Sequence, residues 1–173
     1  AEVSSADSLA EDHVEVDSLR VCIPLAEGRL EFRLPSKKWT FSRTIERPDG
    51  MLFQYSREIL ADSLHRPIKP GITIALEKTR REMDVVEYST LLRSRAMMKW
   101  QIDRILSHED SKLQLRNALW YQIRYIDPGR NEHSSFIIHA KKGTTGIQII
   151  TDVTTELLPM VEEDWNRFVE SLS

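Results

Sequence analysis

Residues 134–173, SSFIIHAKKGTTGIQIITDVTTELLPMVEEDWNRFVESLS, alternate between apolar and polar side chains, turn, alternate again and then change to helical spacing. The two alternating runs, 134–142 and 146–153, flank a turn at Gly143, and so short a connection joins antiparallel strands only. One helical stripe after them collects Leu157 or Leu158, Val161, Trp165, Phe168, Val169 and Leu172. We therefore expect an antiparallel sheet with one apolar face and a terminal helix that covers this face.

The start and the outer face of this terminal helix are also visible in the sequence. Thr154 or Thr155 is expected to cap it, and Pro159 is tolerated in a first helical turn. The acidic run is expected on the solvent side of the helix: Glu162, Glu163 and Asp164.

Earlier alternating runs predict more strands. They are residues 19–25, 28–35, 39–45, 51–58, 71–79 and 118–127. Turn-forming residues lie between several of them, at 26–28, 48–50, 70–71 and 128–129. These short connections again favour an antiparallel meander.

The period changes to that of a helix in the middle of the chain, and a helix is predicted from about 85 to 100. Its apolar stripe consists of Val85, Tyr88, Leu92 and Ala96. Asp84 and Glu87 have the spacing of a capping box at its start. Met97 and Met98 are expected to fill the core. A polar break at 108–117 follows.

The chain is expected to form one domain at 20–173 behind a flexible acidic leader at 1–19. A chain of 173 residues is a normal size for one domain. Its first twenty residues hold six acids against one base, Arg20, and too little apolar surface to offset the entropy of ordering. An acidic interaction tail is the alternative. The net charge of −3 does not indicate a nucleic-acid-binding protein, because such proteins concentrate basic charge on one face.

Cysteine content and hydropathy limit the compartment only weakly. The single cysteine, Cys22, excludes an internal disulfide and a cysteine metal cluster. No apolar run reaches the ~20 residues of a membrane helix, and the first residues lack the pattern of a signal peptide.

Candidate catalytic and metal-binding residues are sparse. His133 and His139 share one face of the strand with Ile137, and a third metal ligand would have to come from 108–110, so a solvent-exposed face is the preferred interpretation. Cys22 is expected to be buried in an apolar strand and inert. The run KKGTTG lacks phosphate-loop spacing and predicts a hairpin turn. No nucleophile elbow is present. We therefore expect no cofactor, no metal and no enzymatic activity.

Basic residues gather around the middle helix and form the one candidate interaction surface: Lys78, Arg80, Arg81, Arg93, Arg95 and Lys99. Acidic residues are interleaved with them, at 77, 82, 84, 87 and 103. A mixed solvated surface is therefore the competing interpretation.

The order of these elements resembles the PsbP-like family, also called the Mog/PsbP fold. The segments that carry the resemblance are GRLEFRLPSKKWTF, PIKPGITIALEKTRREMDVVEYSTLLRSR and ELLPMVEEDWNRFVESL, within residues 28–172. The resemblance implies an α+β fold, an α/β/α sandwich with a central antiparallel sheet, one mid-chain helix and one C-terminal helix.

The function expected from this resemblance is that of a non-enzymatic accessory or protein-binding module. Its location is expected to be extracytoplasmic, periplasmic or on the outer surface, with a lipid anchor on the native N-terminus as one form. The partner is expected to be a protein and not nucleic acid. The alternative is a cytoplasmic regulatory or secretion-related adaptor.

Overall fold

The computed structural model of the chain describes residues 18–108 and 113–173, apart from the side chains of 103–108. Of the expected leader at 1–19, only Ser18 and Leu19 belong to the described residues. The elements in chain order are β1 (Arg20–Pro24), β2 (Arg29–Arg33), β3 (Trp39–Arg47), β4 (Gly50–Arg57), β5 (Leu60–Ala61), β6 (Pro67–Ile68), β7 (Gly71–Lys78), α1 (Val85–Lys99), β8 (Gln101–His108), β9 (Ala118–Ile126), β10 (Glu132–Lys142), β11 (Thr145–Thr154), a 3₁₀ turn (Thr155–Leu157) and α2 (Leu158–Ser171).

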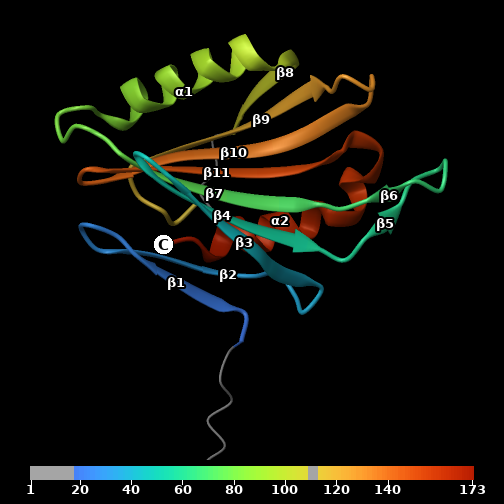
Figure 1. Ribbon diagram of the computed structural model, residues 1–173, viewed down its shortest axis with the longest axis horizontal. Coiled ribbons are helices and arrows are strands. Elements are labelled where there is room, and N and C mark those ends of the chain that lie inside the picture. Colours follow the sequence, from blue (N-terminus) through green and yellow to red (C-terminus); the bar gives the residue numbers. More distant parts are fainter. Residues whose placement is uncertain (1–17, 109–112) are drawn as a thin grey trace, which may run out of the picture.

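Seven strands form one antiparallel sheet in the order β3-β4-β7-β11-β10-β9-β8 (Figure 1). The hairpin β10–β11 pairs Lys142 with Thr145 across the turn at Gly143, whose φ of 60° suits glycine. β11 then pairs with β7 on its other side. The expected α+β architecture with a central antiparallel sheet, a mid-chain helix and a C-terminal helix is confirmed.

The two-residue strands β5 and β6 and one strand of the seven-stranded sheet, β8, were missed by the sequence analysis. β8 begins immediately after α1 and pairs with β9 at the edge of the sheet. The helix ends at Lys99, and Trp100 after it has an extended backbone. The spacing of the apolar residues in β8 is also compatible with a helix. Pairing with β9 makes this segment a strand.

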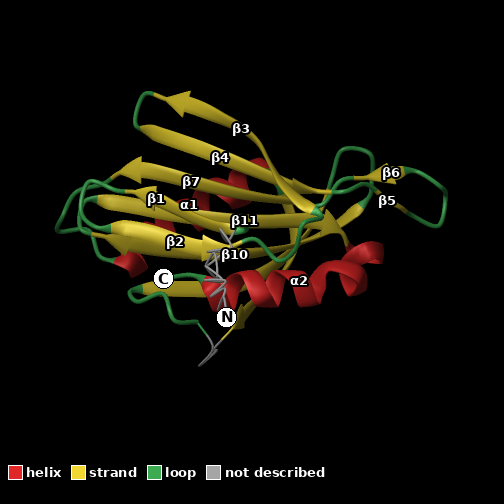
Figure 2. Ribbon diagram, turned by 90° about the horizontal axis from the view of Figure 1, so that it is seen from below, coloured by secondary structure: helices red, strands yellow, loops and turns green. Residues whose placement is uncertain are grey.

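The terminal helix α2 covers one face of the sheet together with the hairpin β1–β2 (Figure 2). The expected apolar stripe is confirmed, since Val161, Trp165 and Phe168 are fully buried there. Phe32 of β2 packs edge-to-face on Phe168 at 5.3 Å. We name this side the α2 face.

Two details of α2 differ from expectation. Thr154 makes no side-chain capping hydrogen bond. A 3₁₀ turn follows it, and α2 begins only after this turn, with Leu157 at the N-cap position. Asp164 does not lie on the solvent side, as its Oδ2 accepts a hydrogen bond from Trp39 Nε1 at 3.0 Å and lies 3.6 Å from Arg57 Nε.

The first hairpin and the end of the chain are held together by backbone hydrogen bonds. Glu31 N donates to Ser173 O at 3.0 Å, and Ser173 N donates to Glu31 O at 2.9 Å. Arg33 N donates to Ser171 Oγ at 2.9 Å. The hairpin β1–β2 therefore depends on α2 for its position.

The helix α1 packs on the opposite side, which we name the α1 face. The predicted capping box of Asp84 and Glu87 is present. Tyr88 and Leu92 of the expected stripe are buried. The expectation that Met97 and Met98 fill the core is wrong, since both are exposed, Met98 to 90%. They lie near the C-terminal end of α1, on its solvent side.

Candidate binding groove

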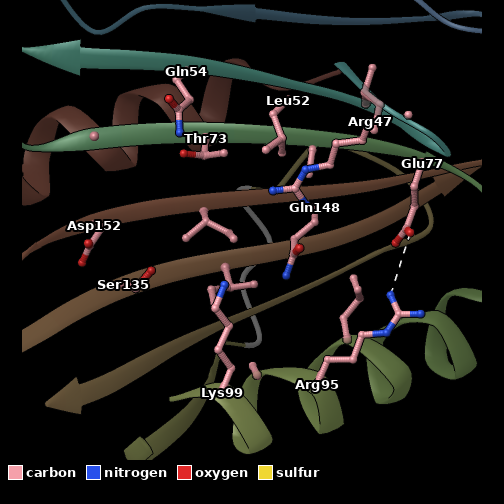
Figure 3. A pocket seen from close by; sticks show the side chains of 18 of the residues that line it. Arg47, Leu52, Gln54, Thr73, Glu77, Arg95, Lys99, Ser135, Gln148 and Asp152 are labelled. Atoms are coloured by element: carbon pink, nitrogen blue, oxygen red, sulfur yellow. Dashed lines mark ion pairs between the residues drawn. The ribbon is translucent and has the colours of Figure 1, made fainter. Parts of the chain in front are cut away.

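A groove of about 760 Å³ lies between α1 and the sheet (Figure 3). It exists because α1 packs mainly over β8, β9 and β10, so that much of the α1 face of β4, β7 and β11 stays uncovered. Side chains from β3, β4, β7, β9, β10, β11 and α1 line it.

The floor of the groove combines small, neutral polar and apolar side chains in register across three strands. Leu52, Ala75 and Gln148 occupy neighbouring positions on β4, β7 and β11. Gln54 and Thr73 form part of the next row, with Ile150 beyond them. Because Ala75 and Thr73 are short, the central strand leaves space above it.

The height of α1 above the sheet is fixed near its first turns. Gly146 of β11 lies directly below Tyr88, and a Cβ atom on Gly146 would come within 2.6 Å of the Tyr88 ring. This close approach needs glycine and seats the N-terminal half of α1 on the sheet. Ala96 and Lys99 in the second half form a wall of the groove.

Three acidic groups line the groove, and two of them, Glu77 and Asp152, have partners within the protein, whereas Asp49 is exposed. Glu77 pairs with Arg95 at 3.9 Å. Asp152 accepts a hydrogen bond from Tyr125 Oη at 2.8 Å, and its other oxygen lies 3.1 Å from His133 Nδ1. Glu77 is therefore paired with a cation, and Asp152 is held by two hydrogen-bonding partners.

Four cations line the groove, and in the described part of the chain only Arg95 has an acidic partner there, whereas Arg47, Lys69 and Lys99 differ in this respect. Neither Arg47 nor Lys99 has an acidic partner among the described residues, although Lys99 Nζ lies 5.4 Å above the ring of Trp100. Figure 3 shows both side chains reaching into the groove from opposite sides, with Gln148 between them in this view. The residues that line the groove therefore carry four positive groups against three negative ones.

His133 joins two aspartates at the end of the groove that Asp152 lines. Its Nε2 lies 2.8 Å from Asp127 Oδ2, and its ring stacks on Tyr125 at 4.9 Å. The hydrogen bond to Asp152 is the main cause that raises the pKa of His133, and Asp127 adds to it. In turn, the backbone of Asn131 and the ring of His133 lower the pKa of Asp127 to about 2.

His139 has the opposite environment. It is fully buried, its Nδ1 lies 2.8 Å from Ser89 Oγ, and its Nε2 lies 3.1 Å from Tyr121 Oη and 3.2 Å from Gln148 Nε2. Burial lowers the pKa of His139 to about 3, with a smaller contribution from Arg93. The interpretation of this strand face as solvent-exposed is therefore wrong for His139, because α1 covers it.

Other predicted features also changed. Cys22 is exposed, not buried, because its neighbour Ile23 is the residue of β1 that points to the core. Residues 108–110, considered as a source of a third metal ligand, have no described side chains. Among the residues that are described, no group of three or more His, Cys, Asp or Glu could hold a metal ion. Within the same residues no helix is long and apolar enough to cross a membrane.

The six basic residues of the candidate interaction surface do not form one patch in the structure. Arg95 and Lys99 line the groove, whereas Arg93 lies 5.9 Å above the Tyr121 ring. Arg81 forms an ion pair with Glu27 in the β1–β2 turn. The other two, Lys78 and Arg80, are exposed at the end of β7 and just after it.

Sequence reasoning missed Arg47, Thr73 and Gln148 as members of one site. Each looked like the polar member of an alternating strand. The signal that remains in the sequence is the small or amide side chain, such as Thr73 and Gln148, at positions where a solvent-facing strand usually carries charge. Only the strand order reveals that they adjoin.

Comparisons with known proteins agree with the fold and add no function. No family model and no curated relative matches the sequence. The chain is similar in structure to PA94 from Pseudomonas aeruginosa, described as a protein of unknown function and a proposed regulator. The TM-score is 0.52 at 11% identity, over 89% of this chain and 96% of that chain. The solution structure of cyanobacterial PsbP (CyanoP) from Synechocystis sp. PCC 6803 gives a TM-score of 0.45 at 6% identity, over 83% and 85%. The likeness to PA94 indicates a shared fold.

Proposed function

We propose that the chain is a non-enzymatic binding module and that the groove between α1 and the sheet is its recognition site. The observation that carries this proposal is the groove itself. Its volume of about 760 Å³ falls in the range of roughly 300–1,000 Å³ usual for small-molecule sites. It combines apolar walls with a few convergent polar groups, as such sites do.

The absence of catalysis is part of the proposal and is supported by the state of the histidines. A general base must reach the proton that it removes. His139 is sealed below α1, and both ring nitrogens of His133 lie against carboxylates. Ser135, which lines the groove, donates its hydroxyl to the carbonyl of Thr151.

Ligand retention tests the groove. The purified chain is incubated with a total metabolite and lipid extract, separated by gel filtration and examined by native mass spectrometry. We expect the wild-type chain to retain a small molecule and Ala75→Trp to lose it, because the indole fills the floor. Thr44→Trp, on an exposed position of β3 outside the groove, is the matched control and should retain it. Equal retention by both variants, or none by the wild type, would contradict the proposal.

For the location we propose an extracytoplasmic accessory protein of the PsbP-like kind, lipid-anchored in one form. The element order supports this resemblance. A protein partner at the basic residues from Lys78 to Lys99 stays a prediction. Fractionation of cells that make the full-length precursor, with the intact mass of the mature chain, tests the location. A diacylated membrane-associated species supports the lipoprotein, whereas an unprocessed cytoplasmic species favours a regulatory or secretion-related adaptor.

A further inference from the structure

We infer that the groove binds a small amphiphile, with an oxyanion head group between Arg47 and Lys99 and an apolar body along the α1 wall. This inference rests on the proposed function and names the chemistry of its ligand. The head group is a carboxylate or a phosphate, which both offer the same oxygen acceptors to these two cations.

The charge of the groove selects an anion. Three acids line the groove: Asp49, Glu77 and Asp152. Arg95 satisfies Glu77, and Tyr125 and His133 satisfy Asp152. Asp49 is exposed and follows Arg47 by two positions. A cationic ligand would have to compete with these internal partners. An anion, in contrast, meets two cations that no described acid neutralises.

In the view of Figure 3 these two cations extend toward each other across the groove. Arg47 extends from the end of β3 and Lys99 from the last turn of α1, so the two come from opposite walls (Figure 3). The Arg47 guanidinium offers a planar fork that fits two oxygens, and Lys99 adds a point charge. The Gln148 amide on the floor supplies a neutral hydrogen-bonding group beside them.

The remaining lining suits an apolar body. Leu92 and Ala96 of α1 face the groove, opposite Leu52, and Ile137 and Ile150 continue the apolar strip along the floor. Removal of apolar surface from water is worth roughly 25 cal/mol per Å². A short hydrocarbon chain on these side chains therefore adds affinity that an inorganic anion cannot obtain.

The location of the tryptophans provides a direct probe. Trp39, Trp120 and Trp165 are buried in the α2-face core, whereas Trp100 lies on the groove and is 39% exposed. A change in tryptophan emission on ligand addition therefore reports mainly on the groove.

The test is a titration of this emission with four ten-carbon probes at concentrations below their micelle range: decanoate, decyl phosphate, decanol and decyltrimethylammonium. We expect decanoate or decyl phosphate to bind at least roughly tenfold more tightly than decanol, and decyltrimethylammonium to bind most weakly. Arg47→Gln and Lys99→Gln should each weaken the anionic probe about tenfold and leave decanol unchanged. Arg167→Gln, on exposed α2, is the matched control and should change nothing.

The result separates this inference from the proposed function. The tighter of the two anionic probes identifies the head group. If decanol binds as tightly as the anions, or if both glutamine variants keep full affinity, the oxyanion site is overturned while the groove stands. If the extract experiment shows a retained ligand but none of the four probes binds, the inference that the ligand is an amphiphile is likewise overturned. Loss of retention in that experiment overturns the proposed function itself.

Discussion

The two faces of the same sheet differ in composition and in role. On the α2 face, the strands present large apolar side chains such as Ile72 and Ile74, and α2 with β1–β2 closes over them. On the α1 face, the same strand β7 presents Thr73 and Ala75, and α1 packs mainly on β8, β9 and β10, toward the β8 edge of the sheet. One strand therefore contributes to the core with one set of alternate residues and to the groove with the other.

This difference separates stability from recognition. Burial of apolar surface is the main favourable contribution to folding, so the α2 face is expected to dominate the free energy of unfolding. The groove floor lies beside a smaller apolar cluster, which includes Tyr121 and Ile123, and itself carries Thr73, Ala75 and Gln148. It is free to carry polar and charged residues whose interactions with a ligand would otherwise compete with packing.

The largest effect is expected on the α2 face. Trp165 is fully buried and packs edge-to-face on Phe136 at 5.2 Å. Trp165→Ala should lower the free energy of unfolding by about 3–5 kcal/mol, because it leaves a large cavity. Urea denaturation measures this, with the exposed Arg167→Ala as a control expected within about 0.5 kcal/mol of wild type. A loss below about 1 kcal/mol for Trp165→Ala would show that the faces contribute more equally than the packing indicates.

A medium effect on stability is expected when the pH is lowered, because His139 of β10 is buried below α1. His139 is neutral in the fold because its pKa is lowered to about 3. In the unfolded chain, His139 takes up a proton near pH 6.5. The stability that neutral His139 provides is therefore fully present above pH 6.5 and is lost as the pH falls toward 3. The free energy of unfolding falls by up to about 1.4 kcal/mol per pH unit in this window. His139→Gln should flatten this dependence between pH 6 and 4.5, measured as the difference from wild type in urea midpoints. Parallel curves for the two proteins would refute the assigned burial.

The smallest effect is expected on the groove floor. Thr73→Val keeps the shape of the side chain and removes a hydroxyl that no described group binds. The free energy of unfolding should change by less than about 0.5 kcal/mol, by thermal denaturation. At Ile74, one position along, Ile74→Ala is expected to cost about 2–5 kcal/mol because this side chain is buried on the α2 face. Similar effects at 73 and 74 would remove the distinction between the faces.

Alternation and helical spacing predicted the α2 face well. Leu30, Phe32, Trp165 and Phe168 are large and apolar, and burial follows directly from such residues at regular spacing. The capping box of α1 was equally predictable, because its signal is local. The strand β8 was not, since its conformation depends on the edge of β9 more than on its own residues.

The groove was harder to predict for a physical reason. Arg47, Thr73, Gln148 and Lys99 come from four elements, and each alone is an ordinary surface residue. Their proximity depends on the order β4-β7-β11, which pairs segments far apart in the chain. The state of His139 similarly depends on how far α1 descends over Gly146, which no local pattern encodes.

The bonds between β2 and the end of α2 have a consequence for the making of the protein. Arg33 and Ser171 are 138 positions apart, and ribosomes add roughly 5–20 residues per second. For roughly 7–28 s, therefore, Leu30 and Phe32 have been synthesised without the helix that buries them. During this interval the apolar side chains of the nascent hairpin are exposed. We expect ribosome-associated chaperones that shield apolar segments to bind the hairpin until α2 has been synthesised.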